Sequence, residues 1–159
     1  FIRYCPNYDS IQVFEPDPSN MERVKSKLGS SRNINYHAFG AWNREAVLTF
    51  EAGGSASRFS ESGKLSIQVR RIDHMINEPF TFLKMDIEGG ELEALEGARE
   101  SINKYYPRLA VSVYHKPDDL RKVPNLILSY RDDYDLYLRH YTEGVTETVM
   151  FFIPNKNEY

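Results

Sequence analysis

Acidic side chains follow two apolar segments of this sequence, at the point where each segment ends. The run Phe82 to Met85 leads into Asp86 and Glu88, and the run Ile11 to Phe14 leads into Glu15. We expect both runs to be buried strands. Open α/β sheets bind ligands at the carboxyl ends of their strands. Acids at that edge predict a site for a hydroxyl-rich or cationic small molecule.

Glu15 is a candidate ligand for a ribose. An acid at the end of the second strand of a nucleotide-binding α/β unit accepts hydrogen bonds from the ribose hydroxyls, because its two oxygens match a vicinal diol. Glu15 also precedes Pro16-Asp17-Pro18, so a solvated acid ahead of a helix is the alternative interpretation. No glycine-rich turn precedes it in this sequence.

Asp86 and Glu88 are separated by one residue, Ile87, which puts their side chains on the same side of an extended chain. Such a pair can bind a cationic ligand, position a hydroxyl nucleophile, act as a general base or hold a divalent metal. The alternative is that Glu88 simply stabilises the positive N-terminus of the helix that follows.

His115 follows the next predicted strand, 109–113, at the same edge of the sheet as Asp86. A neutral imidazole can deprotonate a substrate hydroxyl near neutral pH. A hydrogen-bonded structural histidine is the alternative. No two of the four histidines have metal-ligand spacing and Cys5 is the single cysteine, so we predict no resident metal from spacing.

Trp42 lies a few residues beyond the predicted strand 33–38. Its indole could shelter an adenine-like ring close to Ala38. Packing of Trp42 against an inserted hairpin is the competing interpretation.

The composition is that of an ordinary globular domain. The 159 residues are 41% hydrophobic and 27% charged, enough for one full core. A net charge of −3 with interspersed signs argues against a nucleic-acid partner. The apolar runs are too short to span a membrane, and no signal-peptide pattern opens the chain, so we expect no membrane partner and a cytoplasmic location.

The order of the predicted elements gives the fold class. Asp17 and Pro18 predict a helix that ends at Gly29, and 1–4 reads as the end of another helix. One helix is expected over 91–105, and another opens at Pro117 and breaks at Pro124. Strands are predicted at 11–15, 33–38, 46–51, 65–70, 81–86, 109–113, 134–141 and 146–153, with a flexible loop at 53–63. This alternation predicts a single α/β domain, with a mainly parallel sheet, helices on both faces and a C-terminal antiparallel hairpin.

Taken in order, these residues resemble the FkbM-type methyltransferases, which depend on S-adenosylmethionine. The resemblance extends over nearly the whole chain and is carried by Val13-Phe-Glu-Pro-Asp-Pro-Ser-Asn20, the stretch from Asn35 to Trp42, Phe82-Leu-Lys-Met-Asp-Ile-Glu-Gly-Gly-Glu91 and onward to Gly97, Pro107 to Leu120, and Tyr137 to Tyr141. It implies a Rossmann-like methyltransferase fold, S-adenosylmethionine as the donor, and O-methylation of a hydroxyl on a sugar or natural product.

The resemblance also assigns roles by position. Glu15 would hold the cofactor ribose, and the stretch 37–42, with Ala38 and Trp42, would border the adenine. Asp86 and Glu88 would lie beside the methionine moiety. His115 would face the acceptor, which is a small molecule or a glycan, and either His115 or Asp86 would serve as the base.

One family element is missing from the printed sequence. The first strand and its Asp-x-Gly-x-x-x-Gly loop would lie just before Phe1, so we expect the 159 residues alone to bind the cofactor weakly or not at all. An exposed sheet edge would then favour a homo-oligomer. Two alternatives to the methyltransferase remain: a non-catalytic domain that binds a partner or glycan, and a divalent-metal enzyme using Asp86, Glu88 and His115.

Overall fold

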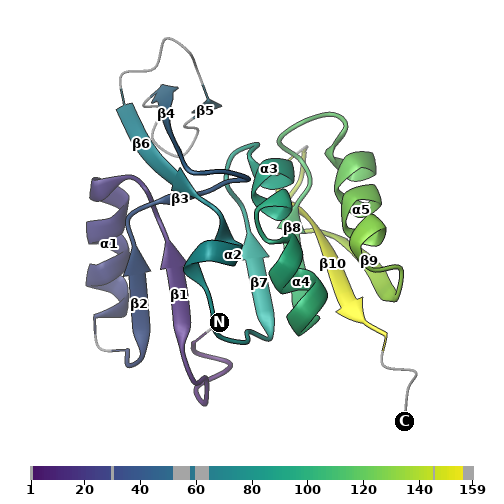
Figure 1. The fold of residues 1–159 in the computed structure, drawn as a ribbon, viewed down its shortest axis with the longest axis horizontal. Coiled ribbons are helices and arrows are strands. Elements are labelled where there is room, and N and C mark those ends of the chain that lie inside the picture. The colour runs from purple at the N-terminus through teal and green to yellow at the C-terminus, as the bar shows by residue number, and fades with distance from the viewer. Residues whose placement is uncertain (1, 30, 52–57, 60–64, 145, 156–159) are drawn as a thin grey trace.

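The computed structural model describes residues 2–29, 31–51, 58–59, 65–144 and 146–155. Its strands form three hydrogen-bonded sheets, with the orders β1-β2, β3-β6-β4-β5 and β7-β8-β10-β9 (Figure 1). The strands are β1 (Ile11–Phe14), β2 (Ile34–His37), β3 (Gly40–Ala41), β4 (Ala46–Glu51), β5 (Arg58–Phe59), β6 (Leu65–Arg70), β7 (Phe82–Met85), β8 (Arg108–Ser112), β9 (Tyr134–His140) and β10 (Thr148–Pro154). The helices are α1 (Pro18–Leu28), α2 (Ile72–Met75), α3 (Glu91–Glu96), α4 (Arg99–Tyr105) and α5 (Asp119–Tyr130).

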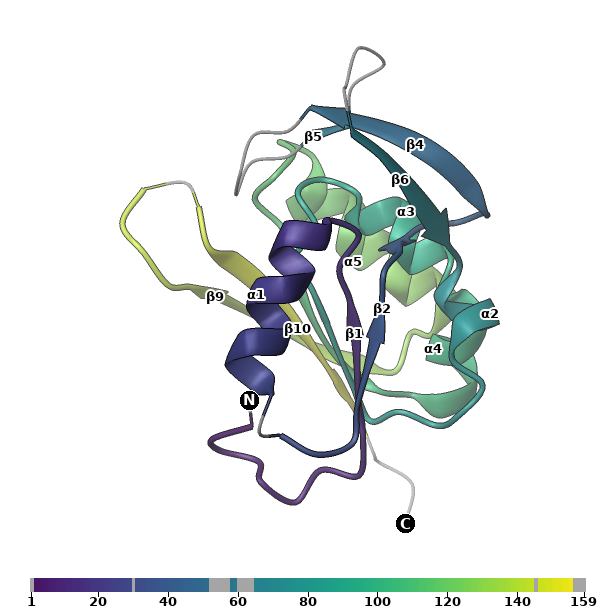
Figure 2. The same ribbon diagram turned by 90° about the vertical axis from the view of Figure 1, so that its left-hand side faces the viewer.

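The prediction of a mainly parallel sheet is confirmed only in part. The pairs β1–β2, β3–β6 and β7–β8 are parallel, whereas β4–β5, β4–β6, β8–β10 and β9–β10 are antiparallel. The α/β class, the inserted antiparallel hairpin of β4 and β6, and the C-terminal hairpin of β9 and β10 are as predicted. Helices lie on both sides of the strands, with α1 opposite α2 and α4 (Figure 2).

Local sequence signals account for the first helix. The Asp17 carboxylate accepts hydrogen bonds from the backbone N–H groups of Ser19 and Asn20, and Pro18 occupies the first helical turn. These are the groups that a helix N-terminus leaves unsatisfied. Met21 then buries its side chain beneath the helix. Ahead of it, residues 2–4 form a turn rather than the predicted end of a helix.

The helix predicted over 91–105 is instead two helices, α3 and α4, which are separated at Gly97 and Ala98. The break has a tertiary cause. The Asp73 side chain, at α2, accepts hydrogen bonds from the backbone N–H groups of Glu100 and Ser101, at 3.0 and 2.8 Å. A capping carboxylate from a distant segment thus starts a new helix at this point.

Gly97 also lets another backbone segment approach. A Cβ atom there would lie 1.8 Å from the carbonyl oxygen of Trp42. The segment that approaches Gly97 is the one just after β3.

The prediction that Pro124 breaks its helix is wrong, because α5 runs without interruption from Asp119 to Tyr130. Val123 and Ile127 are fully buried on either side of the proline. Burial of these side chains offsets the hydrogen bond that proline cannot donate.

The main core lies between the sheet β7-β8-β10-β9 and the helices α3, α4 and α5 (Figure 1). Its fully buried side chains include Leu95, Ile102, Leu109, Val111, Ile127 and Phe152. A smaller cluster consists of Ile67 and Val69, on strand β6 of the inserted hairpin. The loop predicted at 53–63 lies outside the described residues, apart from β5.

None of the helices in the described parts of the chain is long and apolar enough to cross a lipid bilayer.

Candidate functional site

Strands β1, β2 and β7 run in the same direction, so their carboxyl ends lie toward one side of the molecule (Figure 1). Asp86 follows β7 directly after the buried Met85. The chain then turns sharply through Glu88 and Gly89, which have φ values of 57° and 97°. A glutamate in this left-handed region is uncommon, and such residues concentrate at functional sites.

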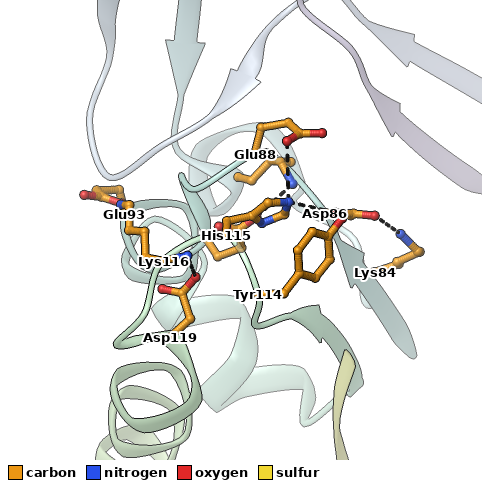
Figure 3. Close-up of polar contacts among 10 residues, drawn as sticks. Lys84, Asp86, Glu88, Glu93, Tyr114, His115, Lys116 and Asp119 are labelled. Atoms are coloured by element: carbon orange, nitrogen blue, oxygen red, sulfur yellow. Dashed lines mark hydrogen bonds and ion pairs between the residues drawn. The ribbon is translucent and has the colours of Figure 1, made fainter. Parts of the chain in front are cut away.

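His115 lies in the loop after β8 and faces this turn (Figure 3). Its side chain is only 8% exposed. Its Nε2 atom is 3.6 Å from Asp86 Oδ1 and 3.5 Å from Glu88 Oε2, while its Nδ1 atom is 2.9 Å from Glu91 Oε1. The structure therefore brings together the three residues that sequence analysis selected from two different loops.

Glu91 is the functional candidate that sequence analysis missed. It is the first residue of α3, its side chain is 1% exposed, and its Oε1 atom accepts a hydrogen bond from the backbone N–H of Ile87 at 2.9 Å. An acid in the first turn of a helix is ordinarily explained by the helix dipole. The burial of the Glu91 side chain distinguishes it from such an acid, and this burial is visible only in the folded chain.

The acids around His115 set its charge. Burial alone would lower the pKa of His115, but the hydrogen bond to Glu91 and the negative charges of Glu91, Glu88 and Asp86 outweigh burial and raise it. Burial alone would raise the pKa of Glu91, but His115 and the Ile87 N–H together lower it. His115 and Glu91 form a charge-coupled pair through Nδ1 of the imidazole. The other nitrogen, Nε2, is directed toward Asp86 and Glu88.

Asp86 already has partners on both oxygens. The Tyr114 hydroxyl lies 3.3 Å from Oδ1 and the Lys84 ammonium 3.3 Å from Oδ2. Burial and the charge of Asp86 raise the pKa of Tyr114. Tyr114 is therefore a hydrogen-bond donor at neutral pH, and Asp86 is less available as a base than His115.

Asp119 fixes the loop that carries His115. Its buried carboxylate accepts a hydrogen bond from the backbone N–H of Lys116 at 2.7 Å. The Lys116 ammonium extends outward, 3.9 Å from Glu93 Oε2 (Figure 3). The loop is thus held by a backbone contact, while the charged side chain of Lys116 stays at the surface.

Glu15 follows β1 at the same side of the molecule as Asp86. Its Oε1 atom accepts a hydrogen bond from the Asp17 N–H at 2.8 Å, which orients the carboxylate. Burial is the largest of the effects that raise its pKa. An oriented, partly desolvated carboxylate is suited to accept hydrogen bonds from a diol.

Ala38 and Trp42 differ in their surroundings. Ala38 follows β2 and is exposed. Trp42 packs against Ile67 and Val69, beneath the inserted hairpin. The packing expected as the alternative for Trp42 is present in the structure, whereas contact with an adenine stays a prediction for both residues.

The cluster also has the composition of a cation site. One ligand atom from each of Asp86, Glu91 and His115 lies within 4.8 Å of the others. Two carboxylates and an imidazole suit a divalent metal, and they suit a positively charged organic group equally well.

Comparisons with known proteins assign the chain to a family. The Methyltransferase FkbM domain family matches residues 1–142. The crystal structure of the methyltransferase FkbM from Methylobacillus flagellatus KT is 34% identical, with a TM-score of 0.78 over 95% of this chain. The present chain spans only 38% of that protein's length.

A second solved structure shares the fold alone. SMU.1697c from Streptococcus mutans, in complex with SAH, is 12% identical, with a TM-score of 0.51, over 90% of this chain and 75% of that one. No curated protein gives a significant match. The FkbM match includes the turn after β7, the loop that carries His115 and the strand that precedes Glu15. The chain therefore belongs to the FkbM methyltransferase family.

Proposed function

We propose that this protein is an S-adenosylmethionine-dependent methyltransferase that methylates a hydroxyl group of a sugar or other small molecule. The observation that carries the proposal is the cluster of His115, Glu91, Asp86 and Glu88 at the carboxyl ends of β7 and β8, in a chain of this family. A fold relative solved in complex with SAH gives further support for the cofactor.

The acidic residues fit the cofactor's chemistry. S-adenosylmethionine supplies an electrophilic methyl group on a sulfonium when it is bound. Glu15, oriented by the Asp17 N–H, is suited to the ribose hydroxyls. Asp86 and Glu88 would provide negative charge near the methionine moiety. Methyl transfer requires alignment of the nucleophile with the methyl group, so residues that position the two partners supply much of the rate.

His115 is the proposed general base. Its Nε2 atom would accept the proton of the substrate hydroxyl, and Glu91 on Nδ1 would stabilise the imidazolium that forms. A base whose pKa is raised toward the working pH is more effective, and such bases contribute about 10²–10⁴-fold to rate. The two occupied oxygens of Asp86 make it the weaker candidate.

Calorimetric titration of S-adenosylhomocysteine into the full-length protein tests the cofactor. We expect binding that Glu15→Ala weakens by about 1–3 kcal/mol, the cost of losing a charged hydrogen-bond partner. Glu22→Ala is the matched control, because this glutamate on α1 is exposed and contacts only Lys25 among the described residues. Absence of binding by the full-length protein would favour the non-catalytic alternative. Titration of residues 1–159 alone tests the expected weak binding.

A divalent-metal enzyme is the second candidate, and the grouping of Asp86, Glu91 and His115 is the observation in its favour. Calorimetry with Mg²⁺ or Mn²⁺ separates the two. Tight metal binding that Asp86→Ala abolishes, together with activity that a chelator removes, would favour the metal enzyme over a metal-free methyl transfer.

A further inference from the structure

We propose that the free edge of β9 pairs with β9 of a second copy of this protein, about a two-fold axis at Tyr137. Strand β9 is the last strand of its sheet, and among the described strands its one hydrogen-bonded neighbour is β10. The β9–β10 hairpin projects from the body of the molecule (Figure 2).

The strand has the features of an interaction edge. It is seven residues long, and every residue after Tyr134 is exposed. Its large apolar side chains are exposed by 38% at Leu136, 58% at Tyr137 and 57% at Leu138. Edges are commonly protected by proline, a bulge or charged side chains, lysine above all. The sequence Tyr-Asp-Leu-Tyr-Leu-Arg-His contains no proline or lysine and pairs with β10 in continuous register, and the charges that it does carry are those of Asp135 and Arg139.

Backbone hydrogen bonds show which groups are available at this edge. The Tyr141 N–H donates to the Glu147 carbonyl, and the Asn155 N–H donates to the Asp133 carbonyl. Odd-numbered residues therefore direct their backbone groups toward β10, because the direction alternates along an antiparallel strand. The N–H and C=O groups of Leu136 and Leu138 consequently point outward, where a further strand can bind them.

The sequence of β9 is complementary to itself when it runs antiparallel. With Tyr137 opposite Tyr137 of the second copy, Leu136 lies opposite Leu138, and Asp135 lies opposite Arg139. Leu136 and Leu138 then form the hydrogen-bonded pairs that their outward backbone groups require. The Asp135–Arg139 pairs fall at non-hydrogen-bonded positions, where side chains approach most closely. Opposite charges facing each other across strands are stabilising.

Other symmetric registers match less well. A two-fold axis at Leu136 places Arg139 opposite Asp133, which lies outside β9 and already forms an ion pair with Arg131. A two-fold axis at Leu138 also gives the outward backbone N–H and C=O groups their hydrogen-bond partners. In that register, however, Arg139 lies opposite Tyr137 and not opposite Asp135. Charge complementarity therefore selects the register centred on Tyr137, and it selects a second copy as the occupant of the edge.

Sedimentation of the full-length protein tests the interface by a charge swap. We expect a dimer whose Kd rises at least ~10-fold in Arg139→Asp and in Asp135→Arg, because each places like charges opposite one another twice. The double variant Asp135→Arg with Arg139→Asp should restore the dimer. Arg121→Asp, at a side chain on α5 that is 69% exposed, is the matched control and should leave the dimer intact. A monomeric protein, or single variants that dimerise like the wild type, would overturn the proposal.

A disulfide trap tests the register. In a Cys5→Ser background, Tyr137→Cys should form a cross-linked dimer on mild oxidation, because non-hydrogen-bonded partners have Cα atoms about 4.5 Å apart, within disulfide range. Asp135→Cys, on the same strand face, should not cross-link, since its copies would be separated by four residues along the strand. Cross-linking of Asp135→Cys but not of Tyr137→Cys would refute the pairing.

Discussion

The imidazole of His115 has a carboxylate near each of its two nitrogen atoms, and this arrangement shifts the pKa values of both His115 and Glu91. The three acids raise the pKa of His115, and the imidazole contributes to lowering the pKa of Glu91. The imidazolium is therefore favoured in the folded protein above the pH at which an ordinary histidine loses its proton, near 6.5.

Glu91→Gln should lower the pKa of His115 and move the rising limb of kcat/KM to lower pH. The substitution removes the negative charge at Nδ1 and retains the shape of the side chain. NMR titration of the imidazole carbon-bound protons measures the shift directly. Glu93→Gln is the matched control, since Glu93 contacts Lys116 rather than the imidazole. An unchanged pKa in Glu91→Gln would contradict the proposed role of this residue.

His115→Gln should destabilise the protein more at pH 6 than at pH 9. A group whose pKa is raised by folding contributes its full stabilisation below the unfolded pKa and loses it as the pH rises through the folded pKa. Loss of a charged hydrogen bond predicts about 1–3 kcal/mol at pH 6. Urea unfolding of wild type and variant at both pH values measures the difference. A larger difference at pH 9 would reverse the assigned direction of the pKa shift.

At the scale of elements, the junction between α3 and α4 determines how the inserted hairpin joins the core. Gly97 accommodates the Trp42 carbonyl, and the Asn43 side chain donates a hydrogen bond to Glu96 at 2.7 Å. Asp73 caps α4 from the other side. Three segments far apart in the sequence thus converge on one turn.

Gly97→Ala should destabilise the protein by about 1–3 kcal/mol or more, the usual cost of overpacking a close contact. The added methyl group would meet backbone, at the Trp42 carbonyl, and backbone cannot move aside as a flexible side chain would. Thermal or urea unfolding measures the loss. At the adjacent position, Glu96→Ala removes one exposed hydrogen bond and should cost no more than about 1 kcal/mol. Equal losses for the two variants would argue against a close approach at Gly97.

At the scale of the whole molecule, the proposed cofactor residues come from separate sheets. Glu15 follows a strand of the pair β1-β2, and Asp86 follows a strand of the sheet β7-β8-β10-β9. A ligand that contacts both would stabilise the folded state of both sheets together.

S-adenosylhomocysteine at about 100 times its Kd should therefore stabilise the full-length protein by about 2.7 kcal/mol, because it binds the folded state alone. Differential scanning calorimetry with and without the ligand measures this as a rise in Tm. Glu15→Ala at the same ligand concentration should show a smaller rise, whereas Glu22→Ala should match the wild type. A rise that is equal in all three proteins would exclude Glu15 from the site.

The sequence by itself determined the elements whose causes are local. Asp17 and Pro18 start α1 because a cap and a fixed φ act within one helical turn. Alternating apolar and polar side chains predicted the pairing of β4 with β6, because strand faces repeat every two residues. The turn residues Glu143 and Gly144 predicted the pairing of β9 with β10. The positions of Asp86, Glu88 and His115 after predicted strands also predicted that the three side chains lie close together, since parallel strands end at one edge, and the structure brings them together.

Only the tertiary structure decided the features whose causes lie far away in the sequence. The break at Gly97 depends on Asp73 and Trp42, and the continuity of α5 through Pro124 depends on burial of Val123 and Ile127. The role of Glu91 depends on a loop that returns from β8 to place His115 against it. Hydrogen bonds and burial between distant segments are created by folding, so no local pattern in the sequence can reveal them.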